Sequence, residues 1–359
     1  MAFGCGFHLD PQSVHPGNIF FFDEVVFLQR NKVVGTLVVD ERRDALCEWI
    51  GQFTPYGSCE IKVASSDASF RRYFRMDTPD GSRIIMDSPP HLEPCKPFIE
   101  IGQRLASSGI QVPKIYFQDP VQGFLVLSDF GDRHFQDILH TQERNERYTD
   151  AIQQIINLQI ASQSWFSELP LFDRDWQAKE LEIFREWCLP DTSQEEFTSY
   201  TSELIEGIDA IPKCMMHRDF HCRNLLVLED NSIGIIDFQG AMNGPITYDL
   251  VSLLRDCYVD NSEDWISQKI ATFRTQLIQS GLLNPEVNVG TLTKWFDWAG
   301  LQRHLKCVGI FHRLKIRDGK PKYLEDVPRV LSYIDQVLSN YPELCDLKSL
   351  VSQAQLLQP

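Results

Sequence analysis

The sequence has no pair of cysteines spaced as C-x-x-C, although ten cysteines are scattered between Cys5 and Cys345. It therefore has neither a zinc-knuckle nor a thioredoxin-like motif, and reduced thiols are the simplest interpretation. No stretch approaches the ~20 consecutive apolar residues of a membrane span, and the first residues lack the basic and apolar regions of a signal peptide. These absences predict a cytoplasmic protein without a membrane partner.

Basic residues are also scarce, because 34 Lys and Arg stand against 50 Asp and Glu, a formal net charge of −16. Binding to a phosphate backbone needs clustered Lys and Arg, so a nucleic-acid partner is excluded. The 359 residues suggest about two domains, at ~150 residues for each. The composition favours a small-molecule substrate, and we predict no obligatory protein partner.

The first half of the chain predicts a small sheet with one helix. Strand patterns occupy residues 59–63, 70–76, 83–86 and 122–127, and apolar residues recur at helical spacing between Phe98 and Leu105. An amphipathic helix is predicted over residues 40–51. Residues 1–40 contain no motif that we can assign, so we treat them as an N-terminal extension.

The second half of the chain is mainly helical. Periodic apolar segments cover residues 147–166, 176–187, 197–208, 248–257, 265–280 and 291–311. Only two short strands are predicted there, at residues 225–228 and 234–236, joined by the hairpin sequence Glu229-Asp230-Asn231.

The most informative segment contains His217-Arg218-Asp219, then Asn224, and then Asp237 after the predicted hairpin. Phosphoryl transfer needs a carboxylate that orients and deprotonates the attacking hydroxyl, and oxygen ligands that hold Mg²⁺ against the phosphates of ATP. Asp219 suits the first role. Asn224 and Asp237 suit the second, because Mg²⁺ prefers hard oxygen donors. The spacing is that of a kinase catalytic loop.

The alternative is a polar loop in which Asp and Asn side chains bond only to their own backbone. Four residue types at set positions and a correctly placed later Asp favour the kinase interpretation. A zinc site at His217 and His221 is a further alternative, but both lie inside the loop motif rather than on a helix. His217 is better interpreted as a support for the loop.

Residues 217–224 together with Asp237 resemble the Brenner motif of aminoglycoside phosphotransferases and choline kinases, relatives of the protein kinases. More narrowly, residues 65–75, 235–241, 244–256, 302–306 and 317–321 resemble bacterial anomeric kinases of N-acetylmuramate and N-acetylglucosamine. The resemblance covers roughly residues 42–340. It implies an α+β, bilobal, protein-kinase-like fold, with an antiparallel-sheet N-lobe at residues 41–128 and a helical C-lobe at residues 129–359.

The same resemblance implies an activity and several site residues. The sugar C1 hydroxyl would be phosphorylated to a sugar 1-phosphate in peptidoglycan recycling. Ser66 and Ser69 would lie in a loop over the ATP phosphates, and Leu127 and Asp129 in a hinge that contacts adenine through the backbone. Asp249 would support the catalytic loop, with an ordinary helix N-terminal carboxylate as the alternative.

One departure from the family pattern concerns the third strand, where residues 83–87 lack the Lys that holds the α- and β-phosphates. Arg71 or Arg72 on the neighbouring strand could supply this charge, because guanidinium binds phosphate well. An exposed strand cation is the alternative for either residue. Asp129-Phe130-Gly131 spells the metal-binding motif of protein kinases, yet it precedes the catalytic loop, so we interpret it as the hinge.

Two other functions remain open from the sequence. An aminoglycoside or amino-alcohol kinase would use the same catalytic loop, and the acidic charge would suit a cationic substrate. A nucleotide-binding pseudokinase is suggested by the missing Lys, but the presence of Asp219, Asn224 and Asp237 argues against it. The cations between Arg303 and Lys322 could meet the carboxylate of the N-acetylmuramate lactyl group or form a solvated helix face.

Overall fold

The computed structural model describes residues 40–57, 60–65 and 70–356. The chain forms two compact units, Met1–Ser58 and Cys59–Pro359. In the first unit, helix α1 (Glu41–Phe53) begins after Asp40, whose side chain accepts a hydrogen bond from the Arg43 N–H. Residues 1–39 of the predicted N-terminal extension lie outside the described residues.

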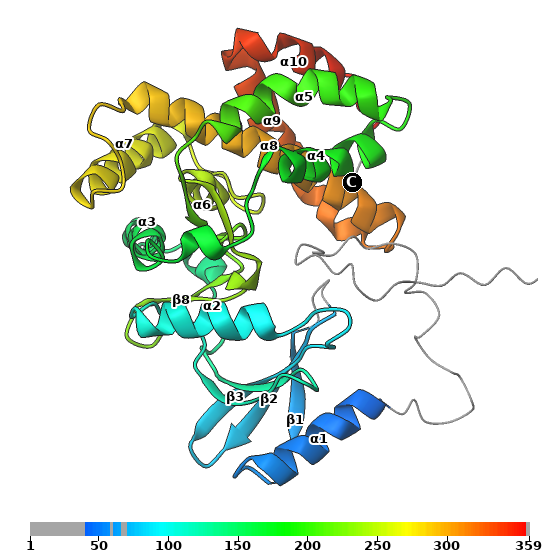
Figure 1. The fold of residues 1–359 in the computed structure, drawn as a ribbon, viewed down its shortest axis with the longest axis vertical. Coiled ribbons are helices and arrows are strands. Elements are labelled where there is room, and N and C mark those ends of the chain that lie inside the picture. The colour runs from blue at the N-terminus through cyan, green and yellow to red at the C-terminus, as the bar shows by residue number, and fades with distance from the viewer. Residues whose placement is uncertain (1–39, 58–59, 66–69, 357–359) are drawn as a thin grey trace, which may run out of the picture. The chain divides into compact units, whose positions relative to one another are not determined.

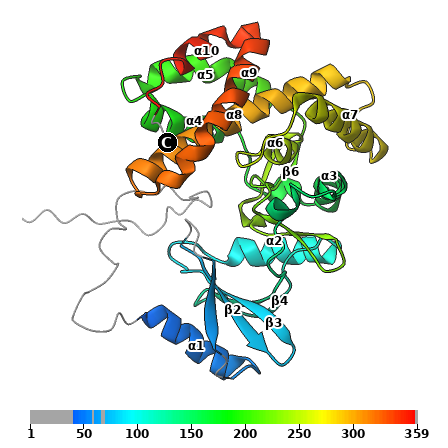
Figure 2. The same cartoon turned by 180° about the vertical axis from the view of Figure 1, so that it is seen from behind.

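The second unit begins with a five-stranded antiparallel sheet in the order β1-β2-β3-β5-β4. Its strands are β1 (Ile61–Ser65), β2 (Arg72–Thr78), β3 (Gly81–Asp87), β4 (Ile115–Asp119) and β5 (Phe124–Ser128). Helix α2 (Lys96–Ser107) connects β3 to β4 and buries Phe98, Ile101 and Leu105. Both ribbon views show α2 between this sheet and the helical part of the unit (Figures 1 and 2).

The prediction of four strands in this sheet was wrong, because β4 also belongs to it. Strand β4 lies at an edge and pairs with β5 alone. Its side chains alternate between half-buried and exposed, and Tyr116 is exposed. An edge strand of five residues with so little buried surface gives only a weak apolar pattern in the sequence.

The helical part is built around one long helix, α8 (Val289–Ile316), which is buried along most of its 28 residues. Gly309 allows this helix to approach α4 closely, because a Cβ at this position would lie 2.7 Å from the backbone of Ile183. The other α-helices of the part are α3 (Arg144–Ala161), α4 (Arg174–Cys188), α5 (Gln194–Asp209), α6 (Tyr248–Leu254), α7 (Glu263–Gln279), α9 (Val327–Asn340) and α10 (Cys345–Val351). Short 3-10 helices are η2 (Phe135–Ile138), η3 (Phe166–Glu168), η4 (Phe238–Gly240), η5 (Pro321–Asp326) and η6 (Pro342–Leu344).

Two strand pairs lie within the helical part. The predicted hairpin is confirmed as β7 (Leu225–Val227) with β8 (Ile233–Ile235). The expectation of only two strands was wrong, because β6 (Lys213–Met216) pairs with β9 (Met242–Pro245). The sequence of β9, Met-Asn-Gly-Pro, has little strand propensity, so this pairing depends on tertiary structure. Among the described residues, no helix combines the length and apolar character that crossing a bilayer requires.

Candidate active site

The candidate catalytic loop begins directly after β6 and is supported by Asp249 in the first turn of α6. The Asp249 carboxylate accepts hydrogen bonds from the backbone N–H groups of His217, at 2.7 Å, and Arg218, at 3.0 Å. Arg218 has a φ of 77°, a left-handed conformation that is costly for a side chain with a Cβ. The two bonds from Asp249 stabilise this turn, as expected for a residue that supports the loop.

Burial raises the pKa of Asp249 to about 6, although the nearby His217 side chain and the two N–H donors oppose this change. The carboxyl group is buried and lies inside the helical part. A buried carboxylate of this kind must be well hydrogen-bonded to remain ionised. The two backbone N–H donors therefore stabilise the ionised carboxylate, and the same two hydrogen bonds hold the loop in place.

The His217 side chain connects the loop to the end of strand β8. Its Nδ1 accepts the Asp219 N–H at 3.3 Å, and its Nε2 lies 3.0 Å from the carbonyl oxygen of Ile236. These partners suit a neutral imidazole with its proton on Nε2. His217 therefore links the residue before Asp237 to the backbone of Asp219.

Asn224 and Asp237 belong to the same network. The Asn224 side-chain NH₂ donates to the Asp219 carbonyl at 3.0 Å, and the Asn224 carbonyl accepts the Ile236 N–H at 3.1 Å. Asp237 follows in a left-handed conformation, with a φ of 65°, at the start of η4. The hairpin between Asn224 and Asp237 thus brings together the three residues that the sequence singled out.

The polar atoms around Asp237 suit a small hard cation. Gln239 Nε2 donates to Asp237 Oδ1 at 2.5 Å, while the buried Gln239 Oε1 has no hydrogen-bond partner in the described chain. The same part of the chain contains no group of three or more His, Cys, Asp or Glu side chains that could hold a metal ion. One carboxylate and nearby amide oxygens fit Mg²⁺, which takes its remaining ligands from water and substrate phosphates.

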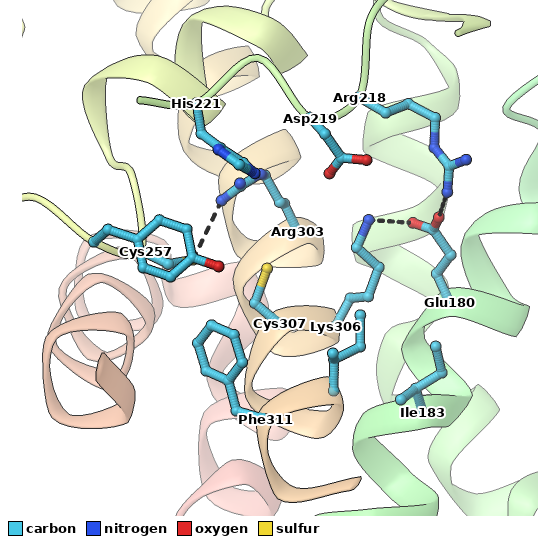
Figure 3. A pocket seen from close by; sticks show the side chains of 12 residues that line it. Glu180, Ile183, Arg218, Asp219, His221, Cys257, Arg303, Lys306, Cys307 and Phe311 are labelled. Carbon is cyan, nitrogen blue, oxygen red and sulfur yellow. Dashed lines mark hydrogen bonds and ion pairs between the residues drawn. The ribbon is translucent and has the colours of Figure 1, made fainter. Parts of the chain in front are cut away.

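A cavity of about 310 Å³ opens beside Asp219. Figure 3 shows the Asp219 carboxylate at this cavity, with Arg303 and Lys306 projecting from α8 and Glu180 from α4. Burial alone would raise the pKa of Asp219, but the positive charges of Lys306 and Arg218 lower it to about 2. Asp219 is therefore ionised at neutral pH.

Glu180 is the counter-ion of two cations that line this cavity. Its carboxylate forms ion pairs with Arg218 and, at 3.3 Å, with Lys306, and it accepts the Gln302 side-chain NH₂ at 3.0 Å. Burial would raise the pKa of Glu180, but Lys306 and Arg218 lower it to about 2. Sequence reasoning missed Glu180, because nothing in the local pattern of α4 marks it and only the packing of α4 against α8 brings it to the site.

Of the residues predicted to bind the ATP phosphates, the structure describes only Arg71 and Arg72. Ser66 and Ser69 lie outside the described residues. Arg72 pairs with Asp87 at 2.6 Å, whereas the Arg71 Nε lies 4.0 Å from Glu93. Both strand cations thus lie near carboxylates, and the Arg71 side chain is 10% exposed against 35% for Arg72.

Tyr73, in β2, feels the charges of both Arg71 and Asp237. Burial raises the pKa of Tyr73, Arg71 opposes the change, and Asp237 adds to it. The start of β2 is therefore within electrostatic range of Asp237. Either Arg71 or Arg72 therefore stays the predicted cation for nucleotide phosphates.

The predicted hinge follows β5. Leu127 is buried within this strand, and Asp129 comes directly after its end. The Asp129 carboxylate accepts hydrogen bonds from Arg75 Nε and Ser82 Oγ, both at 2.6 Å. Its side chain is thus engaged within the sheet, so only the backbone of this segment is left to contact a base.

Comparison with known proteins tests the resemblance. Residues 60–282 match the sequence profile described as "Phosphotransferase enzyme family". The chain belongs to this family. It is therefore an enzyme of the kinase type, with ATP as its phosphoryl donor, and its fold is the predicted bilobal, protein-kinase-like one.

Two curated relatives are similar over most of their length. The N-acetylmuramate/N-acetylglucosamine kinase of Pseudomonas putida is 37% identical over 309 residues, which are 84% of this chain and 89% of that protein. The protein of the same name from Pseudomonas aeruginosa is 36% identical over 301 residues, covering 82% and 88%. A solved aminoglycoside phosphotransferase with ADP bound has a TM-score of 0.52 at 15% identity and covers 84% of this chain and 99% of that one. This last likeness concerns the fold alone.

Proposed function

We propose that this enzyme transfers the γ-phosphoryl group of ATP to the C1 hydroxyl of N-acetylmuramate or N-acetylglucosamine. The product would be the sugar 1-phosphate, and the role would be the recycling of cell-wall amino sugars in the cytoplasm. The observation that supports this best is the identity of 37% to a kinase of that name, over 84% of the chain.

Asp219 would act as the catalytic base. Its low pKa makes it a weak proton acceptor but keeps it ionised, so that it can orient the sugar hydroxyl toward the phosphoryl group. This suits phosphoryl transfer, in which the transition state is loose and positioning contributes most of the catalysis. The proton would pass from the hydroxyl oxygen to the Asp219 carboxylate as the new O–P bond forms.

Asn224 and Asp237 would hold Mg²⁺ through their side-chain oxygens. The Asn224 NH₂ is used by the Asp219 carbonyl, which leaves its side-chain oxygen for a cation. Bound there, Mg²⁺ would neutralise charge on the transferred phosphoryl group. Arg71, directly before β2, or Arg72, at its start, would add a positive charge in place of the absent third-strand Lys.

The charges at the cavity argue against the cationic substrates that remained open from the sequence. Arg218, Arg303 and Lys306 line it together with only two carboxylates, Glu180 and Asp219. A polycationic aminoglycoside would meet this excess of positive charge, although the whole chain is acidic. The volume of about 310 Å³ is at the lower end of the ~300–1,000 Å³ typical of ligand sites, which suits a single sugar ring.

A panel of acceptors with labelled ATP tests the proposal. We expect phosphorylation of N-acetylmuramate or N-acetylglucosamine, and none of kanamycin or choline. The Asp219→Asn variant should lose ~10²-fold or more in kcat while it binds ATP normally, because the base acts at the transition state. Phosphorylation of kanamycin alone, or of no acceptor, would exclude the proposed substrate.

A further inference from the structure

Arg303 is an unusual residue of the cavity, because it is a buried cation without a carboxylate partner. Its side chain extends from α8 and is 3% exposed. Its Nη1 lies 3.4 Å from Cys257 Sγ, and this is its one hydrogen bond to the described part of the chain. Arginine is rarely buried without an anion, because the desolvated charge costs free energy.

Two carboxylates near Arg303, those of Glu180 and Asp256, already have other partners. Glu180 binds Arg218 and Lys306. Asp256 accepts the backbone N–H groups of Cys222, at 2.9 Å, and Tyr258, at 3.0 Å. Asp219 faces the cavity opposite Arg303, but no ion pair joins these two described residues (Figure 3).

Lys306 is a useful comparison, since it lies one turn further along the same face of α8. It also lines the cavity and is 7% exposed, yet it has Glu180 as a counter-ion at 3.3 Å. Glu180 thus satisfies Arg218 and Lys306, whereas the guanidinium of Arg303 remains as the positive charge that the described residues do not pair. An anionic group of a ligand would supply the missing partner.

We propose that Arg303 selects the acceptor by binding a carboxylate of the sugar. This inference rests on the proposed function. N-acetylmuramate bears a 3-O-lactyl ether with a carboxylate, whereas N-acetylglucosamine has a hydroxyl there and is otherwise the same ring. A planar guanidinium forms two parallel hydrogen bonds to a carboxylate, which adds both affinity and orientation. Arg303 is thus a specificity-determining residue that favours N-acetylmuramate.

Each variant can be tested by comparing its kcat/KM values for the two sugars, so that N-acetylglucosamine serves as the control for N-acetylmuramate. Steady-state kinetics of Arg303→Gln should show kcat/KM for N-acetylmuramate reduced by about 10- to 100-fold, mainly through KM, as expected for the loss of a hydrogen-bonded charge. For N-acetylglucosamine the change should stay within about threefold. Arg303→Lys should give an intermediate loss, because it retains charge but not the bidentate geometry.

Lys315→Gln is the matched control, because Lys315 is an exposed cation on the same helix. It should leave the ratio of the two kcat/KM values unchanged. Retained turnover of N-acetylglucosamine by Arg303→Gln would show that this variant is folded. If it does not fold, the ratio of the two kcat/KM values is measured with Arg303→Lys instead, and a lower preference for N-acetylmuramate is expected.

An equal loss of kcat with both sugars would overturn the inference, since Arg303 would then act on the transferred phosphoryl group or on the fold. In that outcome the native enzyme still phosphorylates both sugars, so the proposed function stands. A native enzyme that phosphorylates neither sugar would remove the proposed function and this inference with it.

Discussion

Replacing Glu180 with Gln tests how the cations of the cavity are held. The Glu180 side chain is 8% exposed and has two cationic partners, Arg218 and Lys306. The amide of Gln has nearly the same shape and keeps one oxygen acceptor, but it has no charge. Glu180→Gln would therefore leave two buried cations without their counter-ion.

The expected loss of stability follows from the pKa of Glu180. Against the burial that would raise it, Lys306 and Arg218 lower the pKa from its usual 4.5 to about 2. At ~1.4 kcal/mol per pKa unit, this corresponds to about 3 kcal/mol in the free energy of unfolding. Removing one partner of a buried ion pair costs ~3–5 kcal/mol, which agrees with that figure. Because the pKa is lower in the folded state, the contribution is complete above about pH 4.5 and is lost as the pH falls toward 2.

Urea unfolding at pH 7 measures this loss. We expect Glu180→Gln to reduce the free energy of unfolding by about 3 kcal/mol. Glu206→Gln is the control, because the Glu206 side chain is 62% exposed in its ion pair with Arg174 and should change stability by less than ~1 kcal/mol. A loss of less than ~1 kcal/mol for Glu180→Gln would refute the conclusion that this carboxylate holds the two cations.

Three further changes test other parts of the structure. Asp237→Ala should abolish the Mg²⁺-dependent part of nucleotide affinity in calorimetry, whereas Asp230→Ala in the exposed hairpin should not; unchanged Mg-ATP binding by the former would count against the metal site. Asp249→Asn should turn an NH₂ group toward a backbone N–H, so kcat should fall by ~10-fold or more and stability by ~1–3 kcal/mol, and normal kcat would exclude its role in the loop. Gly309→Val should lower the melting temperature by several degrees, because its Cβ would lie 2.7 Å from the Ile183 backbone; an unchanged melting curve would contradict the close packing of α4 on α8.

The sequence predicted the features that depend on short-range patterns. The hairpin of β7 and β8 was predicted, as were eight of the helices, α1 to α8, because turn residues and apolar spacing determine them locally. The segment from His217 to Asp237 was also informative, since one loop and one hairpin separate its members. The spacing therefore indicated that these residues lie near one another, whereas the hydrogen bonds among them had no signal in the sequence.

Features that depend on packing were not predicted. Strands β6 and β9 are four residues each and are separated by 25 intervening residues, so their pairing has no local signal. Glu180 lines the same cavity as Asp219 only because α4 lies against α8. The predicted domain boundaries at residues 41 and 129 remain predictions.

Phosphorus NMR of the reaction product tests the central claim most directly. The enzyme is incubated with Mg-ATP and N-acetylmuramate, and the coupling of the new phosphorus signal to sugar protons identifies the attacked hydroxyl. We predict one new phosphomonoester coupled to the single anomeric proton, and no such signal with Asp219→Asn over the same time. Coupling to the two C6 protons, or a signal of inorganic phosphate alone, would contradict transfer to the C1 hydroxyl.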